Sequence, residues 1–158
     1  MIKELYTLII ATLLISCDSN RLYEKNISID NDMWSLEQIL NFDFENTDTT
    51  SDVNLILNIR HSNIYPFSNL WVFINTLSPS GEKQVDTLET TLSQKDGKWL
   101  GDGLGSVWNL QVPFKSVRLN ESGTYSFEIE QAMRHGNLSK IESLTGVMEI
   151  GLRIENVE

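Results

Sequence analysis

The sequence predicts an all-β fold, an antiparallel β-sandwich of immunoglobulin-like or jelly-roll-like type. Three observations favour it: apolar and polar residues alternate along several segments, turn residues separate these segments, and helical periodicity is scarce. With 41% hydrophobic and 22% charged residues, the 158-residue chain has the composition of a globular protein. This length fits one domain, expected over residues 31–158 behind an N-terminal lipoprotein signal peptide.

The N-terminus predicts an exported lipoprotein. An apolar run from Leu5 to Ile15 is about half as long as a membrane-spanning helix requires. It ends in Leu14-Ile15-Ser16-Cys17, which matches the lipobox of bacterial lipoproteins (Leu, apolar, small, Cys). Residues 1–16 are therefore predicted to be removed, and Cys17 to carry the lipid. Residues 17–30 are polar without a period and are expected to form a flexible tether.

Cys17 is also the only cysteine of the chain. Once it is lipidated, no thiol remains for a disulfide or for a cysteine-ligated metal, so the fold is expected to rest on packing and to need no cofactor. A net charge of -10 disfavours nucleic acid as a partner, and membrane attachment is expected through lipid alone. No acidic run of the kind that marks surface display follows Cys17. A periplasm-facing protein is therefore expected, on the outer membrane rather than the inner one.

Period-two alternation locates the strands. Four segments place apolar side chains on one face and polar ones on the other; they span residues 53–59, 108–114, 125–129 and 148–154. The run Leu70–Ile74 is apolar on both faces, which predicts a central strand. Turn residues separate the strands, and helix is expected only as a turn or two within residues 32–40 and near residues 131–140.

One segment resembles the corner that precedes a late strand in immunoglobulin-type domains. In Glu121–Phe127, a Tyr follows a Ser-Gly turn, and such a Tyr ties its strand back to the preceding loop through its hydroxyl. We therefore expect Tyr125 to bind the loop, and Phe127 to stand where those domains place a buried Cys.

Catalytic and metal-binding patterns are weak. His61 and His135 belong to no metal or nucleophile motif, and His61 is interpreted as a surface or edge-strand residue. Gly101, Gly103 and Gly105 are interpreted as a flexible turn. A solvated loop is favoured over a calcium site for the acidic cluster, which comprises Asp43, Glu45, Asp48 and Asp52. The protein is predicted not to be an enzyme, although a carboxylate pair for glycoside cleavage stays open because its spacing is spatial.

Aromatic residues provide candidate contacts. Trp71, Phe73, Trp108, Phe114, Tyr125 and Phe127 lie in strand patterns and are most simply core. Tyr65, Phe67 and Trp99 lie at turns, where peripheral packing is favoured. They are also the candidate contacts for a partner protein or a glycan, should their rings be exposed. Thr49 and Thr87 follow Asp in a pattern that is O-glycosylated on exported Bacteroidota proteins, which makes both candidate glycosylation sites.

Seven segments in order resemble the GldH family of gliding-motility lipoproteins of Bacteroidota. They are Ile59–His61, Tyr65–Trp71, Asp86–Glu89, Gly97–Gly101, Gly123–Phe127, Glu130–Arg134 and Gly151–Glu155. The stretch Leu144–Gly151 departs slightly from the family pattern. The resemblance implies a lipid-anchored, non-enzymatic envelope protein required for gliding, which is coupled to type IX secretion, with other envelope proteins as partners. The alternative function is an envelope glycan-binding module.

Overall fold

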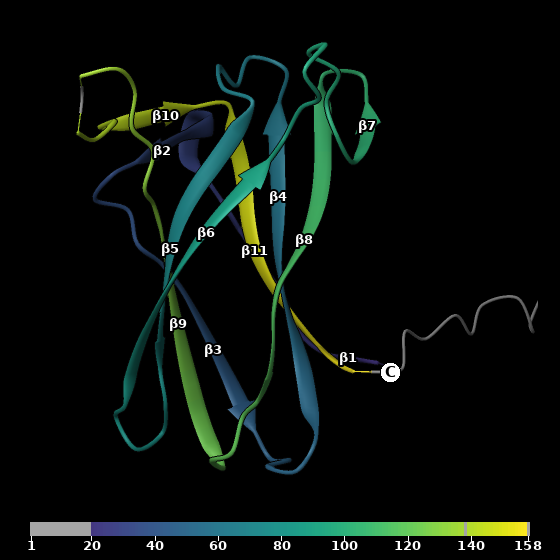
Figure 1. The fold of residues 1–158 in the computed structure, drawn as a ribbon, viewed down its shortest axis with the longest axis vertical. Helices are drawn as coiled ribbons and strands as arrows, with labels where there is room; N and C mark the ends of the chain where they lie inside the picture. Colours follow the sequence, from purple (N-terminus) through teal and green to yellow (C-terminus); the bar gives the residue numbers. More distant parts are fainter. Residues whose placement is uncertain (1–19, 138, 158) are drawn as a thin grey trace, which may run out of the picture.

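The computed structural model describes residues 20–137 and 139–157, and this part of the chain folds as the predicted all-β sandwich (Figure 1). Two antiparallel sheets pack against each other, one of five strands and one of four. Side chains from both sheets meet in one hydrophobic core. The largest fully buried side chains include Trp34, Phe42, Phe127, Leu57, Ile59, Leu70, Ile74, Ile150 and Leu152.

The five-stranded sheet has the order β1-β11-β4-β8-β7. Its strands are β1 (Arg21–Ser28), β11 (Val147–Asn156), β4 (Asp52–Ser62), β8 (Val107–Arg118) and β7 (Asp102–Leu104). Strands β4, β8 and β11 contain three of the predicted alternating segments. The prediction of a flexible turn at Gly101–Gly105 is wrong in part, because Asp102–Leu104 pairs with β8. There Gly103 lies against the Trp108 ring, where a side chain would not fit.

The four-stranded sheet has the order β3-β9-β5-β6. Its strands are β3 (Leu40–Asn46), β9 (Gly123–Gln131), β5 (Asn69–Leu77) and β6 (Lys83–Thr91). Strand β5 lies between β9 and β6, as predicted from the run Leu70–Ile74, which is apolar on both faces. A short pair, β2 (Met33–Ser35) with β10 (Ser143–Thr145), and the 3-10 turn η1 (Asp30–Asp32) lie together at one end of the sandwich (Figure 1).

The tyrosine corner is confirmed. The Glu121 backbone N–H donates to the Tyr125 hydroxyl at 3.2 Å, which ties β9 to the loop before it. Phe127, two residues on, is completely buried, as its position in the corner predicts.

Two local predictions are wrong. Residues 21–28 of the predicted tether form β1, which pairs with β11 and packs Tyr23 and Ile27 against the core. An edge strand can be polar on much of its surface, because backbone hydrogen bonds to its neighbour hold it. No α-helix occurs in residues 20–137 and 139–157, and residues 131–137 run from the end of β9 through irregular backbone into a turn. No helix of this part of the chain could span a membrane.

Candidate interaction surface

A groove of about 430 Å³ lies on the outer face of the four-stranded sheet. Successive side chains of a strand point to opposite faces, so β5 buries Leu70, Val72 and Ile74 and turns the two aromatic residues between them outward. Other lining residues come from the loop before β5, from β6 and from the segment after β9. The lining residues are Phe67, Asn69, Trp71, Phe73, Thr87, Ala132, Met133, Arg134 and His135.

Trp71 is the main exposed aromatic side chain of this groove. It retains 36% of its surface accessible, so the expectation that it belongs to the core is wrong. Its backbone N–H donates to the Met133 sulfur at 3.3 Å, which holds the segment after β9 against β5. Exposed aromatic area of this kind in a concave site is typical of ligand and protein contacts.

Hydrogen-bonded polar side chains lie on the same outer face of the sheet as Trp71 and Phe73. The Asn69 amide donates to the Glu89 carboxylate at 2.8 Å, and the Asn75 amide donates to Glu130 at 3.3 Å. Asn69 lines the groove, and its hydrogen bond to Glu89 fixes the orientation of its amide. Arg134 is exposed and adds a positive charge to the groove in a chain whose net charge is -10.

The three aromatic residues predicted at turns are Tyr65, Phe67 and Trp99. Phe67 and Trp99 both contact the Tyr65 ring, but the three residues differ in exposure. Tyr65 is only 3% exposed, which agrees with packing rather than with an exposed contact, and its hydroxyl donates to the Asn69 carbonyl at 2.8 Å. Burial also raises the pKa of this hydroxyl far above its usual range. Half-buried Phe67 contacts Tyr65 and His135 edge-on or tilted and lines the groove. Half-buried Trp99 packs edge-on against Tyr65.

His61 is fully buried in β4, which corrects the interpretation as a surface or edge-strand residue. It lies 4.6 Å from the Trp99 ring and 5.9 Å from the Tyr65 ring, centre to centre. Its Nδ1 lies 3.1 Å from the Ser62 carbonyl, whereas its Nε2 has no partner among the described residues. Burial lowers the pKa of His61 and favours the neutral ring. No local pattern predicts this burial, because a strand's place in the sheet depends on pairing with distant strands.

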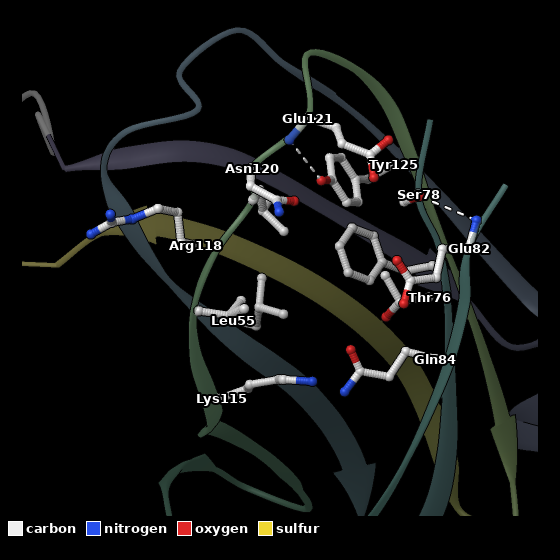
Figure 2. Close-up of a pocket in the computed structure, with 13 residues that line it drawn as sticks. Leu55, Thr76, Ser78, Glu82, Gln84, Lys115, Arg118, Asn120, Glu121 and Tyr125 are labelled. Carbon is white, nitrogen blue, oxygen red and sulfur yellow. Dashed lines mark hydrogen bonds between the residues drawn. The ribbon is translucent and has the colours of Figure 1, made fainter. Parts of the chain in front are cut away.

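A second, smaller cavity of about 120 Å³ lies where β6 faces β8 across the two sheets (Figure 2). Figure 2 shows Lys115 extending from β8 toward Gln84 of β6. The Lys115 ammonium binds the Asp86 carboxylate at 2.8 Å and so links the two sheets at this side. The cavity is too small for a drug-sized ligand.

A third depression of about 460 Å³ follows the outer face of the five-stranded sheet and is polar. Asn58 donates to Glu24 and Asn26, and Gln111 donates to Asn58, so hydrogen-bonded side chains of β1, β4 and β8 run across the sheet over β11. Gly151 lies between them, where a side chain would collide with Asn26. The Glu24 carboxylate also binds two arginines, at 2.8 and 3.6 Å, which assigns it a structural role.

The predicted acidic cluster is dispersed. Asp43 and Glu45 lie on β3 and accept hydrogen bonds from Ser126 and Thr124 on β9. Asp48 caps its own turn by accepting from Thr50 and Ser51, and these hydrogen bonds lower its pKa well below the usual range. Asp52, at the start of β4, binds Arg118 at 2.9 Å. In residues 20–137 and 139–157, no group of three or more His, Cys, Asp or Glu is arranged to hold a metal ion.

The remaining candidate residues are in separate places. Cys17 lies outside the described residues. Thr49 is half-buried in the loop between β3 and β4, and Thr87 is exposed on β6 and forms part of the groove. Three of the seven segments that carry the family resemblance line this groove, namely Tyr65–Trp71, Asp86–Glu89 and Glu130–Arg134.

Comparison with known proteins assigns this architecture to a family. Residues 21–154 match the model of the GldH lipoprotein family. A gliding motility lipoprotein GldH homolog from Christiangramia forsetii is 38% identical over 142 residues, which are 89% of this chain and 86% of the relative. The gliding motility lipoprotein GldH of Flavobacterium johnsoniae is 34% identical over 149 residues, 94% of this chain and 92% of the relative.

Solved structures are more distant. A family GH115 4-O-methyl-α-glucuronidase matches with a TM-score of 0.40 and 13% identity, covering 90% of this chain and 18% of that one. A structure of infectious bursal disease virus matches with a TM-score of 0.34 and 10% identity, covering 86% and 30%. Both TM-scores are below one half, so these likenesses carry no functional argument.

Proposed function

Because the chain belongs to the GldH lipoprotein family, we propose that it is a lipid-anchored, non-enzymatic component of the gliding-motility machinery, coupled to type IX secretion. The observation that carries this proposal is the family match over residues 21–154, together with two relatives that are named gliding motility lipoproteins. The groove supports it, because an exposed aromatic surface is suited to holding another envelope protein.

Lipid on Cys17 supplies the membrane attachment in this proposal. Strand β1 begins at Arg21, four positions after Cys17. Four residues span roughly 14 Å when fully extended, so the sandwich lies close to the bilayer. The outer membrane, with the domain facing the periplasm, is the proposed location.

Gene deletion tests the proposal, with colony spreading and the secreted proteome scored together. Wild-type complementation is expected to restore both, whereas Cys17→Ala restores neither because the chain lacks its anchor. Trp71→Ala is expected to restore protein level but not spreading, since it removes the exposed ring of the groove. Leu104→Ala is the matched control, because Leu104 is 88% exposed on β7 in the five-stranded sheet.

Each arm has an outcome that contradicts it. Unchanged spreading and secretion after deletion would overturn the role in motility. Full rescue by Cys17→Ala would overturn the need for lipid, and full rescue by Trp71→Ala would remove the groove from the mechanism.

Glycan binding is the second candidate function, and the composition of the groove favours it. Trp71 and Phe73 provide apolar faces for a sugar ring, while Asn69 and Arg134 provide polar groups. Pull-down of the full chain with purified peptidoglycan and envelope polysaccharide tests this. Retention that Trp71→Ala abolishes would support it, and absence of retention would exclude it for those polymers.

O-glycosylation of Thr49 and Thr87 is a separate proposal. Thr87 is the more accessible of the two residues, since it is exposed on an edge strand. Intact-mass and peptide mass spectrometry of the native protein tests it, and unmodified Thr49 and Thr87 would exclude the modification.

A further inference from the structure

Strand β6 is an edge strand whose outer side has no partner strand among the described residues. Its nine residues pair with β5 in continuous register, without a bulge. Such an edge presents backbone N–H and C=O groups that an extended polypeptide can bind.

Two backbone hydrogen bonds, one at each end of β6, identify the free groups. The Leu92 N–H donates to the Ser68 carbonyl at 2.7 Å, and the Ser78 N–H donates to the Glu82 carbonyl at 2.9 Å. Hydrogen-bonded and non-hydrogen-bonded pairs alternate in an antiparallel ladder, so even-numbered residues of β6 bind β5. The backbone groups that face outward therefore belong to residues 83, 85, 87, 89 and 91.

The other edges carry protection that β6 lacks. Strand β1 has a register irregularity near Arg21, and β7 is only three residues long. On β3, the Lys25 ammonium binds the Asn41 carbonyl at 3.0 Å. The part of β8 beyond β7 contains Pro113 and an irregularity beside it. Prolines, bulges and short length keep edge strands from pairing. Strand β6 carries one lysine, Lys83, but it has nine residues, no proline and no bulge.

We propose that a second copy of this chain pairs with β6 in antiparallel orientation, with Asp86 opposite its counterpart at the two-fold axis. This register places Lys83 of each copy opposite Glu89 of the other, and Val85 opposite Thr87. Opposite charges and β-branched pairs stabilise neighbouring strands. Both copies use the same surface, as a two-fold dimer requires, and one sheet continues through both.

Neighbouring registers lack this complementarity. A two-fold axis at Thr87 places Lys83 opposite Thr91 and Val85 opposite Glu89. An axis at Val85 places Lys83 opposite Thr87 and leaves Glu89 without a cation. Only the axis at Asp86 pairs the strand's one lysine with a carboxylate that faces the same side.

The residues at this axis tolerate the approach of a second copy. Each Asp86 carboxylate binds Lys115 of its own chain at 2.8 Å, so two neutralised groups meet rather than two free anions. Val85 is 64% exposed and gains a β-branched neighbour. The proposal depends on β6 alone and stands apart from the role in motility.

Disulfide cross-linking in the cell envelope tests the register, using the full-length chain, whose only native cysteine is Cys17. In the proposed dimer, residue 86 forms a non-hydrogen-bonded pair with its counterpart, with Cα atoms about 4.5 Å apart. A disulfide spans this distance. Asp86→Cys is therefore expected to give a covalent dimer on a non-reducing gel after mild oxidation.

Two controls separate this dimer from random collision. Gln84→Cys lies on the same strand, but its counterpart would be about 13 Å away, too far for a disulfide. Asp43→Cys places the thiol on β3, the opposite edge of the same sheet. Each is expected to give at least tenfold less dimer than Asp86→Cys. No dimer from Asp86→Cys, or equal dimer from the controls, would overturn the proposal.

A proline variant tests the backbone contact. Val85→Pro removes an N–H that the fold does not use, so the sandwich is expected to form while the edge can no longer pair. In the Asp86→Cys chain, Val85→Pro is expected to abolish the cross-link and Val85→Ala to retain it, with circular dichroism confirming the strand content of both. An undiminished cross-link with Val85→Pro would also overturn the proposal.

Discussion

The two sheets of the sandwich are held together by different interactions along its two lateral sides, where an edge region of one sheet faces an edge strand of the other. Where β1 meets β3, the Tyr23 and Phe44 rings pack edge-on with centres 5.8 Å apart, and Lys25 lies over the Phe42 ring. Where β6 meets β8, an ion pair between Lys115 and Asp86 spans the gap, and a cavity remains beside it. Aromatic packing fills the space between the sheets on the first side, whereas an ion pair beside a cavity spans the second side.

Phe44→Ala is expected to have the largest effect, because it removes the aromatic packing of the β1/β3 side. Phe44 is buried, and truncation of a buried Phe costs about 3–5 kcal/mol of unfolding free energy. Urea denaturation followed by circular dichroism measures it, with Val85→Ala as the exposed control on the β6/β8 side. A loss below about 1 kcal/mol would contradict the importance of aromatic packing at this side.

His61 is expected to make the stability of the fold depend on pH. Burial lowers its folded-state pKa below the unfolded value, so the neutral form stabilises the fold. This stability is fully present above the unfolded pKa of about 6.5 and is lost as pH falls through the folded pKa. One proton changes stability by no more than about 1.4 kcal/mol per pH unit.

The matched variant is His61→Phe, which cannot take up a proton. Denaturation midpoints measured between about pH 7 and pH 5 are expected to fall less steeply for His61→Phe than for the wild type. Equal slopes would show that His61 does not cause the acid sensitivity.

Tyr23→Phe, on the same β1/β3 side as Phe44, is expected to stabilise the protein rather than destabilise it. The Tyr23 hydroxyl is buried without a hydrogen-bond partner among the described residues, and burial with nearby Asp43 raises its pKa. Removing an unsatisfied buried hydroxyl is expected to stabilise the protein by about 1 kcal/mol. A comparable loss of stability in the same urea assay would indicate that the hydroxyl has a partner, such as a bound water.

Lys115→Met is expected to have the smallest effect. Both partners of the ion pair keep about a quarter of their side-chain surface exposed, and pairs of this kind contribute about 0.5 kcal/mol. The double variant Lys115→Met with Asp86→Asn measures the coupling between the two residues. A coupling above about 2 kcal/mol would show that the ion pair closes its side as firmly as the aromatic packing does.

Much of the architecture follows from local sequence. Alternation over residues 53–59, 125–129 and 148–154 predicts strands that the structure contains, because the period of two is a property of the extended backbone itself. The corner at Tyr125 is equally local, since its hydroxyl binds a backbone group four residues away.

The functional surface could be predicted only in part. The turn position of Phe67 predicts a contact residue, and Phe67 does line the groove, whereas Tyr65 is buried. The apolar run around Trp71 predicts a core residue, yet its ring is exposed in the groove. An apolar run shows that both faces of a strand are hydrophobic, but only the neighbouring layers decide whether both are covered.

The sequence by itself determined the lipobox at Cys17, the strand periodicity and the resemblance to a family. The first two depend on residues close together in the chain, and the third on short segments that can each be read locally. The tertiary structure alone decided that residues 21–28 form a strand, that His61 is buried, and that β6 is an edge. These depend on pairing between segments far apart in the chain. Such pairing sets which backbone groups and side chains remain accessible, and no local sequence pattern predicts it.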